Sequence, residues 1–353
     1  MKTEQRNFLK GMAFLSPWIV GFLVFLALPI VLSAYYSLCD YKVLQAPAFI
    51  GLKNFQDLLH DEVFWKVVKN TFVYAAMALP AGLLVSLGLA LLLNVSIPGQ
   101  AVFRTIVFLP SLVPAAASAM VWMFLLNSRM GLVNPMLERV GVGVVVVLVL
   151  MFFCGIGVMI NTYAHKRTPS FLTMLIVCLA GALMLLEFGL EVSGAKHSLA
   201  HLSLEGPLWF DVNWALRTFA ILSLWGVGNT VVIYLAGLQD VPKELYEAAE
   251  IDGANNLRRL WHVTLPMLSP VIFFNLIMAI IGSLQNFTLP QLITGGNPDN
   301  SSRFYSMYVY DFSFTYLRMG YASAMAWIQL LLVLILTGLA FWFSKRFVHY
   351  QGK

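Results

Sequence analysis

Charged residues are scarce in this chain. Asp, Glu, Lys and Arg make up only 11% of its 353 residues, and 59% of the residues are apolar. A soluble globular domain carries about a quarter charged residues, so a soluble enzyme is excluded and an integral membrane protein is indicated. One helical span of a bilayer needs about 20 apolar residues. The chain therefore accommodates several spans with modest loops and no large extramembrane domain.

Cysteine is also scarce, and nucleotide-binding motifs are missing. Cys39, Cys154 and Cys178 have no C-x-x-C spacing, so they are interpreted as small apolar residues without a disulfide framework. No G-x-x-x-x-G-K-[ST] motif occurs, so the chain does not cradle ATP phosphates in the usual way. The net charge of +5 comes without a clustered basic patch. It fits cytoplasmic loops of a membrane protein better than nucleic-acid binding.

Catalytic and metal-ligating patterns are absent from the sequence as well. His197 and His201 stand four residues apart, but no third ligand follows nearby, so they are interpreted as part of a polar external loop. No paired catalytic groups lie within the apolar runs. We expect no catalytic residue, no metal site and no cofactor in this chain.

What the sequence does contain is apolar runs, which predict an all-α, polytopic helical bundle with eight spans. They cover residues 13–37, 71–94, 104–127, 142–161, 169–191, 214–238, 267–289 and 321–343. Lys and Arg are about twice as dense in the loops on one side, which predicts that both termini are cytoplasmic. The first run is too long for a signal-peptide core, so a retained first helix is expected.

The most polar stretch is residues 239–266, between two spans on the predicted cytoplasmic side. Its acidic residues precede its two arginines, an order that complements a helix dipole. Pro242 suits a first helical turn, and Asp240 could cap it. We expect a short amphipathic helix followed by a break at Leu265-Pro266. Its shared face would hold Tyr246, Ala249, Gly253, Leu257, Leu260 and Trp261.

This loop carries a spaced motif. Glu247-Ala248-Ala249 is followed after three residues by Gly253, after nine more by Val263, and then by Leu265-Pro266. The pattern resembles the EAA loop of ABC-importer permeases, where Ile is usual at the position of Val263. Further segments are similar to this family, so the resemblance covers most of the chain. They are Phe49–Phe55, Phe64-Trp65, Asn70-Thr71, Arg104, Leu109-Pro110, Pro114, Trp122, Gly131–Asn134, Thr294–Pro298 and Gly320–Ala324.

The last two segments are similar to the maltose and glycerol-phosphate type, the carbohydrate-uptake branch. The resemblance therefore implies a permease in the cell membrane that forms the pathway for a sugar or related polyol, and not an enzyme. A solute-binding protein would deliver the substrate, and a second permease subunit would pair with this one. ATP and Mg would be bound by separate ATPase subunits that dock on residues 239–266.

Some site residues follow from the resemblance. The coupling residues that it implies are Glu247, Ala248, Ala249, Asp252, Gly253, Leu257, Leu265 and Pro266. A secondary transporter driven by an ion gradient is the alternative. Such proteins favour acidic or His residues deep within their spans and internal repeats, and neither feature is evident here.

The chain departs from the family by two additional predicted spans. Such permeases have six core spans, and residues 141–205 would add a peripheral two-helix hairpin that contacts lipid or a partner. The predicted organisation has five parts. They are a cytoplasmic N-terminus (1–12), three core spans (13–140), the hairpin (141–205), three core spans with the coupling loop 239–266 (206–343) and a cytoplasmic tail (344–353).

Amide and Trp side chains within the core spans are candidates for the substrate pathway. They are costly in hydrocarbon unless they face protein or water, and a carbohydrate site needs amide partners and aromatic faces. The candidates are Gln285, Asn286, Trp327 and Asn229. Hydrogen bonds between helices and anchoring of Trp at the membrane interface are the alternative interpretations.

Overall fold

The computed structural model describes residues 2–95, 99–127, 131, 133 and 209–344. This part of the chain is helical except for its loops and one antiparallel pair of two-residue strands, β1 (Cys39–Asp40) and β2 (Ala48–Phe49). The predicted all-α class is confirmed for these residues. The predicted hairpin 141–205 and residues 345–353 lie outside the described residues.

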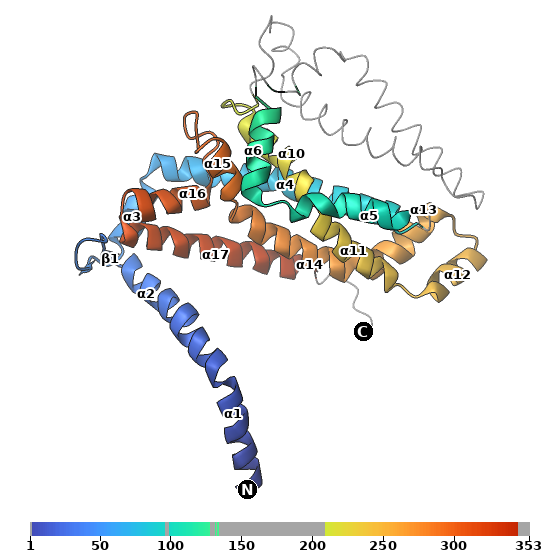
Figure 1. The fold of residues 1–353 in the computed structure, drawn as a ribbon, viewed down its shortest axis with the longest axis horizontal. Helices are drawn as coiled ribbons and strands as arrows, with labels where there is room; N and C mark the ends of the chain where they lie inside the picture. Colours follow the sequence, from blue (N-terminus) through green and yellow to red (C-terminus); the bar gives the residue numbers. More distant parts are fainter. Residues whose placement is uncertain (1, 96–98, 128–130, 132, 134–208, 345–353) are drawn as a thin grey trace, which may run out of the picture. The chain divides into compact units, whose positions relative to one another are not determined.

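The helices of the described residues are shown in Figure 1. In chain order they are α1 (Lys2–Phe22), α2 (Leu28–Ser37), α3 (Lys53–Leu59), α4 (Glu62–Leu93), α5 (Gln100–Phe108), α6 (Ala115–Leu125), α10 (Ala215–Ser223), α11 (Gly228–Gln239), α12 (Lys243–Ile251), α13 (Asn256–Arg259), α14 (Leu265–Leu284), α15 (Thr288–Ile293), α16 (Tyr305–Tyr310) and α17 (Met319–Ser344). Shorter turns join some of them. Two are 3-10 turns, η2 (Leu109–Leu112) and η3 (Leu224–Gly226), and three are π turns, η1 (Leu23–Ala27), η4 (Leu260–Thr264) and η5 (Asp311–Thr315).

Six candidate spans lie within the described residues. Four helical stretches are long and apolar enough to cross a membrane, Lys10–Ser37, Glu62–Leu93, Asn256–Ile293 and Met319–Ser344. Two bent pairs also qualify if each pair is one span, Gln100–Leu112 with Ala115–Leu125 and Ala215–Gly226 with Gly228–Gln239. These six correspond to the six predicted core runs. The other two predicted spans lie outside the described residues.

The predicted span 104–127 is not one continuous helix. The chain bends by 95° between Gln100–Leu112 and Ala115–Leu125. Val113 is extended (ψ 127°) and Pro114 follows it with ψ 138°. The ring of a proline disfavours helical backbone at the residue before it, so the helix ends and α6 begins as a separate element. The second bent pair turns by 49° at Val227, so the run 214–238 is also broken.

The residues divide into two compact units. The first comprises residues 1–65 and 305–334. In it, Asp61 caps the start of α4, because its Oδ1 accepts from the backbone N–H groups of Val63 and Phe64. Its Oδ2 accepts from the hydroxyls of Tyr308 at 2.6 Å and Tyr321 at 3.1 Å. One carboxylate thus joins the start of α4 to α16 and α17.

The second unit comprises residues 66–304 and 335–353, and its core lies where α4, α11 and α14 meet. The buried cluster is Ala90, Leu93, Val231, Tyr234, Leu235, Leu238 and Leu268. At the start of α11, Gly228 packs against α5 so closely that a Cβ there would lie 2.8 Å from the carbonyl oxygen of Val107. The core therefore holds the ends of α11 and α14 from which residues 239–266 project.

Candidate functional site

The predicted coupling loop lies where α11 ends and α14 begins, and α12 is its main helix (Figure 1). α12 starts after Pro242, whose φ of −58° suits the position, and no side chain caps it. The prediction that Asp240 caps this helix is wrong. Asp240 instead ends α11, where its backbone N–H donates to the carbonyl of Ala236.

α12 ends in a Schellman motif rather than continuing through Gly253. The N–H of Ala254 donates to the carbonyl of Ala249, and the N–H of Gly253 donates to that of Glu250. Gly253 has a φ of +75°, a conformation that glycine adopts without strain. The expected helical face running from Tyr246 through Gly253 to Leu257 is therefore wrong, because the helix stops two residues before Gly253.

The chain then turns back into the membrane as one nearly continuous helical stretch. The side chain of Asn255 caps α13 by accepting from the N–H of Arg258 at 2.9 Å. The π turn η4 follows, and Pro266 sits in the first turn of α14. The expected break at Leu265-Pro266 is wrong, because the wider π turn precedes a proline that needs no N–H partner at a helix start.

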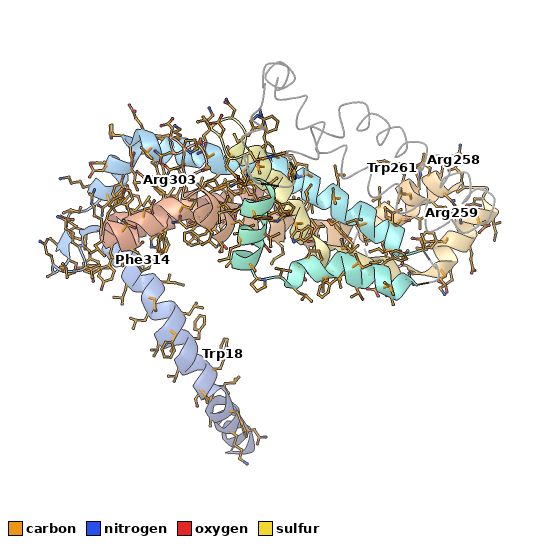
Figure 2. The ribbon with its side chains drawn as sticks, turned by 45° about the horizontal axis from the view of Figure 1, so that its top comes forward. Trp18, Arg258, Arg259, Trp261, Arg303 and Phe314 are labelled. Atoms are coloured by element: carbon orange, nitrogen blue, oxygen red, sulfur yellow. The ribbon has the colours of Figure 1, made fainter. Side chains whose placement is uncertain are left out.

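Residues 239–266 expose several large apolar side chains. Ile251 is 87% exposed, and Leu257 and Trp261 are also exposed, although all three belong to the most polar stretch of the chain. Figure 2 shows Trp261 close to Arg258 and Arg259. Of the predicted coupling residues, Glu247, Ala248, Asp252, Gly253 and Leu257 are exposed, and Ala249, Leu265 and Pro266 are partly buried. The motif thus presents a mixed polar and apolar surface.

Side chains that the motif does not include tie α12 to α13 and to the π turn η4, the two elements that lead into α14. The hydroxyls of Tyr246 and Thr264 lie 3.0 Å apart, and Thr264 is only 5% exposed. A second tie is the ion pair between Glu250 and Arg259, at 3.5 Å. Sequence reasoning placed Tyr246 on an apolar face, but the pairing of its hydroxyl across 18 residues depends on the turn at Gly253, which it missed.

The predicted substrate-pathway residues do not form one cluster within the second unit. Gln285 is exposed at the C-terminal end of α14, and Asn286 follows it, partly buried and near the Tyr74 hydroxyl. Asn229 is exposed near the start of α11. Trp327 belongs to α17 in the first unit. Asn286 itself lies in the short loop between α14 and α15.

A cavity of about 200 Å³ lies between α5 and α11. Its lining is Leu93, Arg104, Val107, Phe108, Gly228, Val231, Val232, Leu235, Ala236 and Gln239. None of the four predicted substrate-pathway residues lines it. Among the described residues, no group of three His, Cys, Asp or Glu is placed to hold a metal ion. His197 and His201 lie outside them.

Comparison with known proteins defines the class of this helical membrane protein. Residues 78–349 match the family model described as the binding-protein-dependent transport system inner membrane component. The chain belongs to this family, and it is a multi-pass inner-membrane protein. The predicted transport subunit, as opposed to an enzyme, is confirmed, because its relatives are ABC transporter permease proteins.

Individual relatives extend over the whole chain. It is 33% identical to the probable ABC transporter permease protein YesP of Bacillus subtilis, over 100% of this chain and 96% of that protein. It is 27% identical to SmoG, a sulfoquinovosyl glycerol transport system permease of Agrobacterium fabrum, over 87% of this chain and 80% of the relative. The fold matches a crystal structure of a bacterial ABC transporter involved in the import of alginate, with a TM-score of 0.70, 22% identity and 99% of both chains covered.

Proposed function

We propose that this chain forms part of the translocation pathway of an ATP-driven importer for a sugar or related polyol. A solute-binding protein delivers the substrate, a second permease subunit completes the pathway, and ATPase subunits dock on residues 239–266. The relative SmoG, a sulfoquinovosyl glycerol permease, supports a carbohydrate-like substrate. Membership of a binding-protein-dependent family favours ATP over an ion gradient as the energy source.

One observation carries the docking proposal, namely the exposed apolar side chains on and beside α12. Ile251 sits at the last position of a helix in which half of the other side chains are charged, and its side chain is 87% exposed. Apolar side chains gathered at one exposed place mark interaction sites. Leu257 and Trp261 extend this surface onto the following segment. With the N-terminus cytoplasmic, the surface faces the compartment that contains ATP.

The test is Ile251→Glu in the full chain, co-expressed with a candidate ABC ATPase subunit from the same organism. A charge at this position should abolish co-purification of the ATPase with the permease, because an apolar contact is replaced by a desolvated carboxylate. Membrane insertion should be unchanged, since Ile251 is exposed and makes no core contact.

Leu44→Glu is the matched control. Leu44 is 88% exposed, close to the value for Ile251, but lies in the loop predicted to face outward. This variant should retain the ATPase. Undiminished co-purification with Ile251→Glu would contradict the docking proposal.

A further inference from the structure

A contact between two hydroxyl groups links α12, on which an ATPase would dock, to the π turn η4 at the start of α14. The two hydroxyls are those of Tyr246 and Thr264. α12 bears Ile251, the most exposed side chain of the docking surface, and α14 belongs to a stretch that is long and apolar enough to cross the membrane. Between them lies the turn at Gly253, where α12 ends and the chain leaves the helical conformation. Without a second attachment, displacement of α12 could be absorbed at this turn. The Tyr246 hydroxyl, 3.0 Å from Thr264 Oγ1, supplies that attachment.

The direction of the hydrogen bonds follows from the protons available. Thr264 has one hydroxyl proton, and its Oγ1 lies 3.4 Å from the Arg259 carbonyl oxygen across the π turn, where it donates. With that proton directed at the carbonyl, the Tyr246 hydroxyl donates to Thr264, although the 3.0 Å separation by itself allows either hydroxyl to donate. The chain Tyr246 O–H, Thr264 O–H, Arg259 carbonyl thus runs from α12 into the π turn at the base of α14.

Thr264 is well placed to pass a displacement onward. It is buried, and Leu268, four residues later, lies on the same helical face. Leu268 is fully buried in the cluster that joins α4, α11 and α14. Close-packed cores transmit displacement rather than absorb it. The second tie, between Glu250 and Arg259, has partners that are 49% and 25% exposed, and exposed ion pairs contribute little.

We infer that Tyr246 and Thr264 are positioning residues that transmit movement of α12 into the membrane helix α14. The inference rests on the proposed function, because it assumes that an ATPase moves α12. The π turn supports the Tyr246–Thr264 contact. Its wider hydrogen-bonded ring brings the Thr264 hydroxyl toward the carbonyl of Arg259, five residues earlier.

The test measures hydrogen–deuterium exchange in the assembled transporter, with and without ATP and orthovanadate. In the wild type, trapping should change the exchange of α12 and of residues 265–271. Tyr246→Phe and Thr264→Val should keep the response of α12 and reduce that of 265–271 by about three- to tenfold, the effect of one buried hydrogen bond. Because Tyr246→Phe removes only the contact that Thr264→Val also removes, the double variant should respond no less than Thr264→Val alone.

Two further variants complete the test. Thr264→Ser keeps the hydroxyl and should restore the response, which a general loss of stability would not. Thr105→Val is the matched control, since its hydroxyl donates to Ala101 within its own helix at 2.9 Å. If Thr264→Val fails to insert, Tyr246→Phe carries the test from outside the span.

Each outcome decides between the proposals. Two results would overturn the role of the Tyr246–Thr264 contact and leave the proposed permease function intact. One is a response of residues 265–271 that persists in Tyr246→Phe. The other is a wild type in which α12 responds to trapping and residues 265–271 do not. An α12 that neither retains the ATPase nor responds to trapping contradicts the proposed function itself.

Discussion

At the scale of single residues, the backbone conformation at position 253 explains why this residue is glycine, and contacts with neighbouring side chains do not. Its φ is +75°, and a Cβ built there would meet nothing within 4 Å. Steric exclusion by another surface of this chain therefore does not explain the glycine. Left-handed backbone costs other residues about 1–2 kcal/mol, and Asn tolerates it better than most.

Substitutions at Gly253 should follow this conformational order. We expect Gly253→Asn to stay closest to the wild type and Gly253→Val to be the least stable in thermal unfolding of the purified protein, with Ala between them. Gly82→Ala is the control, because Gly82 lies inside α4 with an equally open surround and an ordinary helical φ, so alanine should be neutral or stabilising there. Equal stability of all three Gly253 variants would contradict the Schellman assignment.

Gln285 gives the cleaner test of the predicted substrate pathway. Asn286 is partly buried near Tyr74, so its removal would disturb local packing as well as any ligand contact. Gln285 is exposed at the end of α14. Gln285→Ala should lower uptake by about tenfold if its amide bonds a sugar hydroxyl, since such a bond contributes about 1–3 kcal/mol when its partner is left unsatisfied. Unchanged uptake at a normal membrane level would remove Gln285 from the pathway.

At the scale of elements, the sequence predicts where apolar helices lie better than how they bend. All six core runs fall on helical stretches, because 20 or so apolar residues leave few alternatives in a membrane. Prolines within apolar runs do not all act alike. Pro114 instead ends a helix with a 95° bend, whereas Pro266 sits inside a stretch that continues. A preceding π turn distinguishes Pro266, and apolar periodicity does not report it.

Close packing of α5 against α11 leads to a stability prediction. A Cβ at Gly228 would lie 2.8 Å from the Val107 carbonyl and 3.0 Å from the Phe108 Cα. Both are backbone atoms, so the helices would have to separate. Gly228→Ala should therefore destabilise the protein by about 1–3 kcal/mol, as overpacking does. Gly226→Ala, two residues earlier with nothing within 4 Å, should not. Equal melting temperatures for both variants would contradict this packing.

At the scale of the whole molecule, the sequence predicts the class of protein. It does not predict the side-chain contacts within residues 239–266. Composition and the spaced EAA pattern are local features, and family membership confirms the class that they indicate. The Tyr246–Thr264 contact depends on a reversal of chain direction at Gly253. A helical interpretation of the entire loop hides that reversal, because it continues the period of 3.6 through the turn.

The predicted eight-span topology has a direct test in the inserted segment. A reporter active only in the cytoplasm should give signal when fused after Lys166 and none when fused near His197. Lys166 and Arg167 stand in the short connection between the two additional predicted spans, where cytoplasmic basic residues are expected. The reverse pattern of activity would place that connection outside and contradict the hairpin.

The central claim is that residues 239–266 dock an ATPase, and site-specific crosslinking in cells tests it most directly. A photo-crosslinking residue at Ile251, 87% exposed, should form an adduct with the ATPase chain, identified by mass spectrometry. The same residue at Leu44, 88% exposed, should form none with it. An ATPase adduct at Leu44 and none at Ile251 would contradict both the docking surface and the cytoplasmic orientation from which it is inferred.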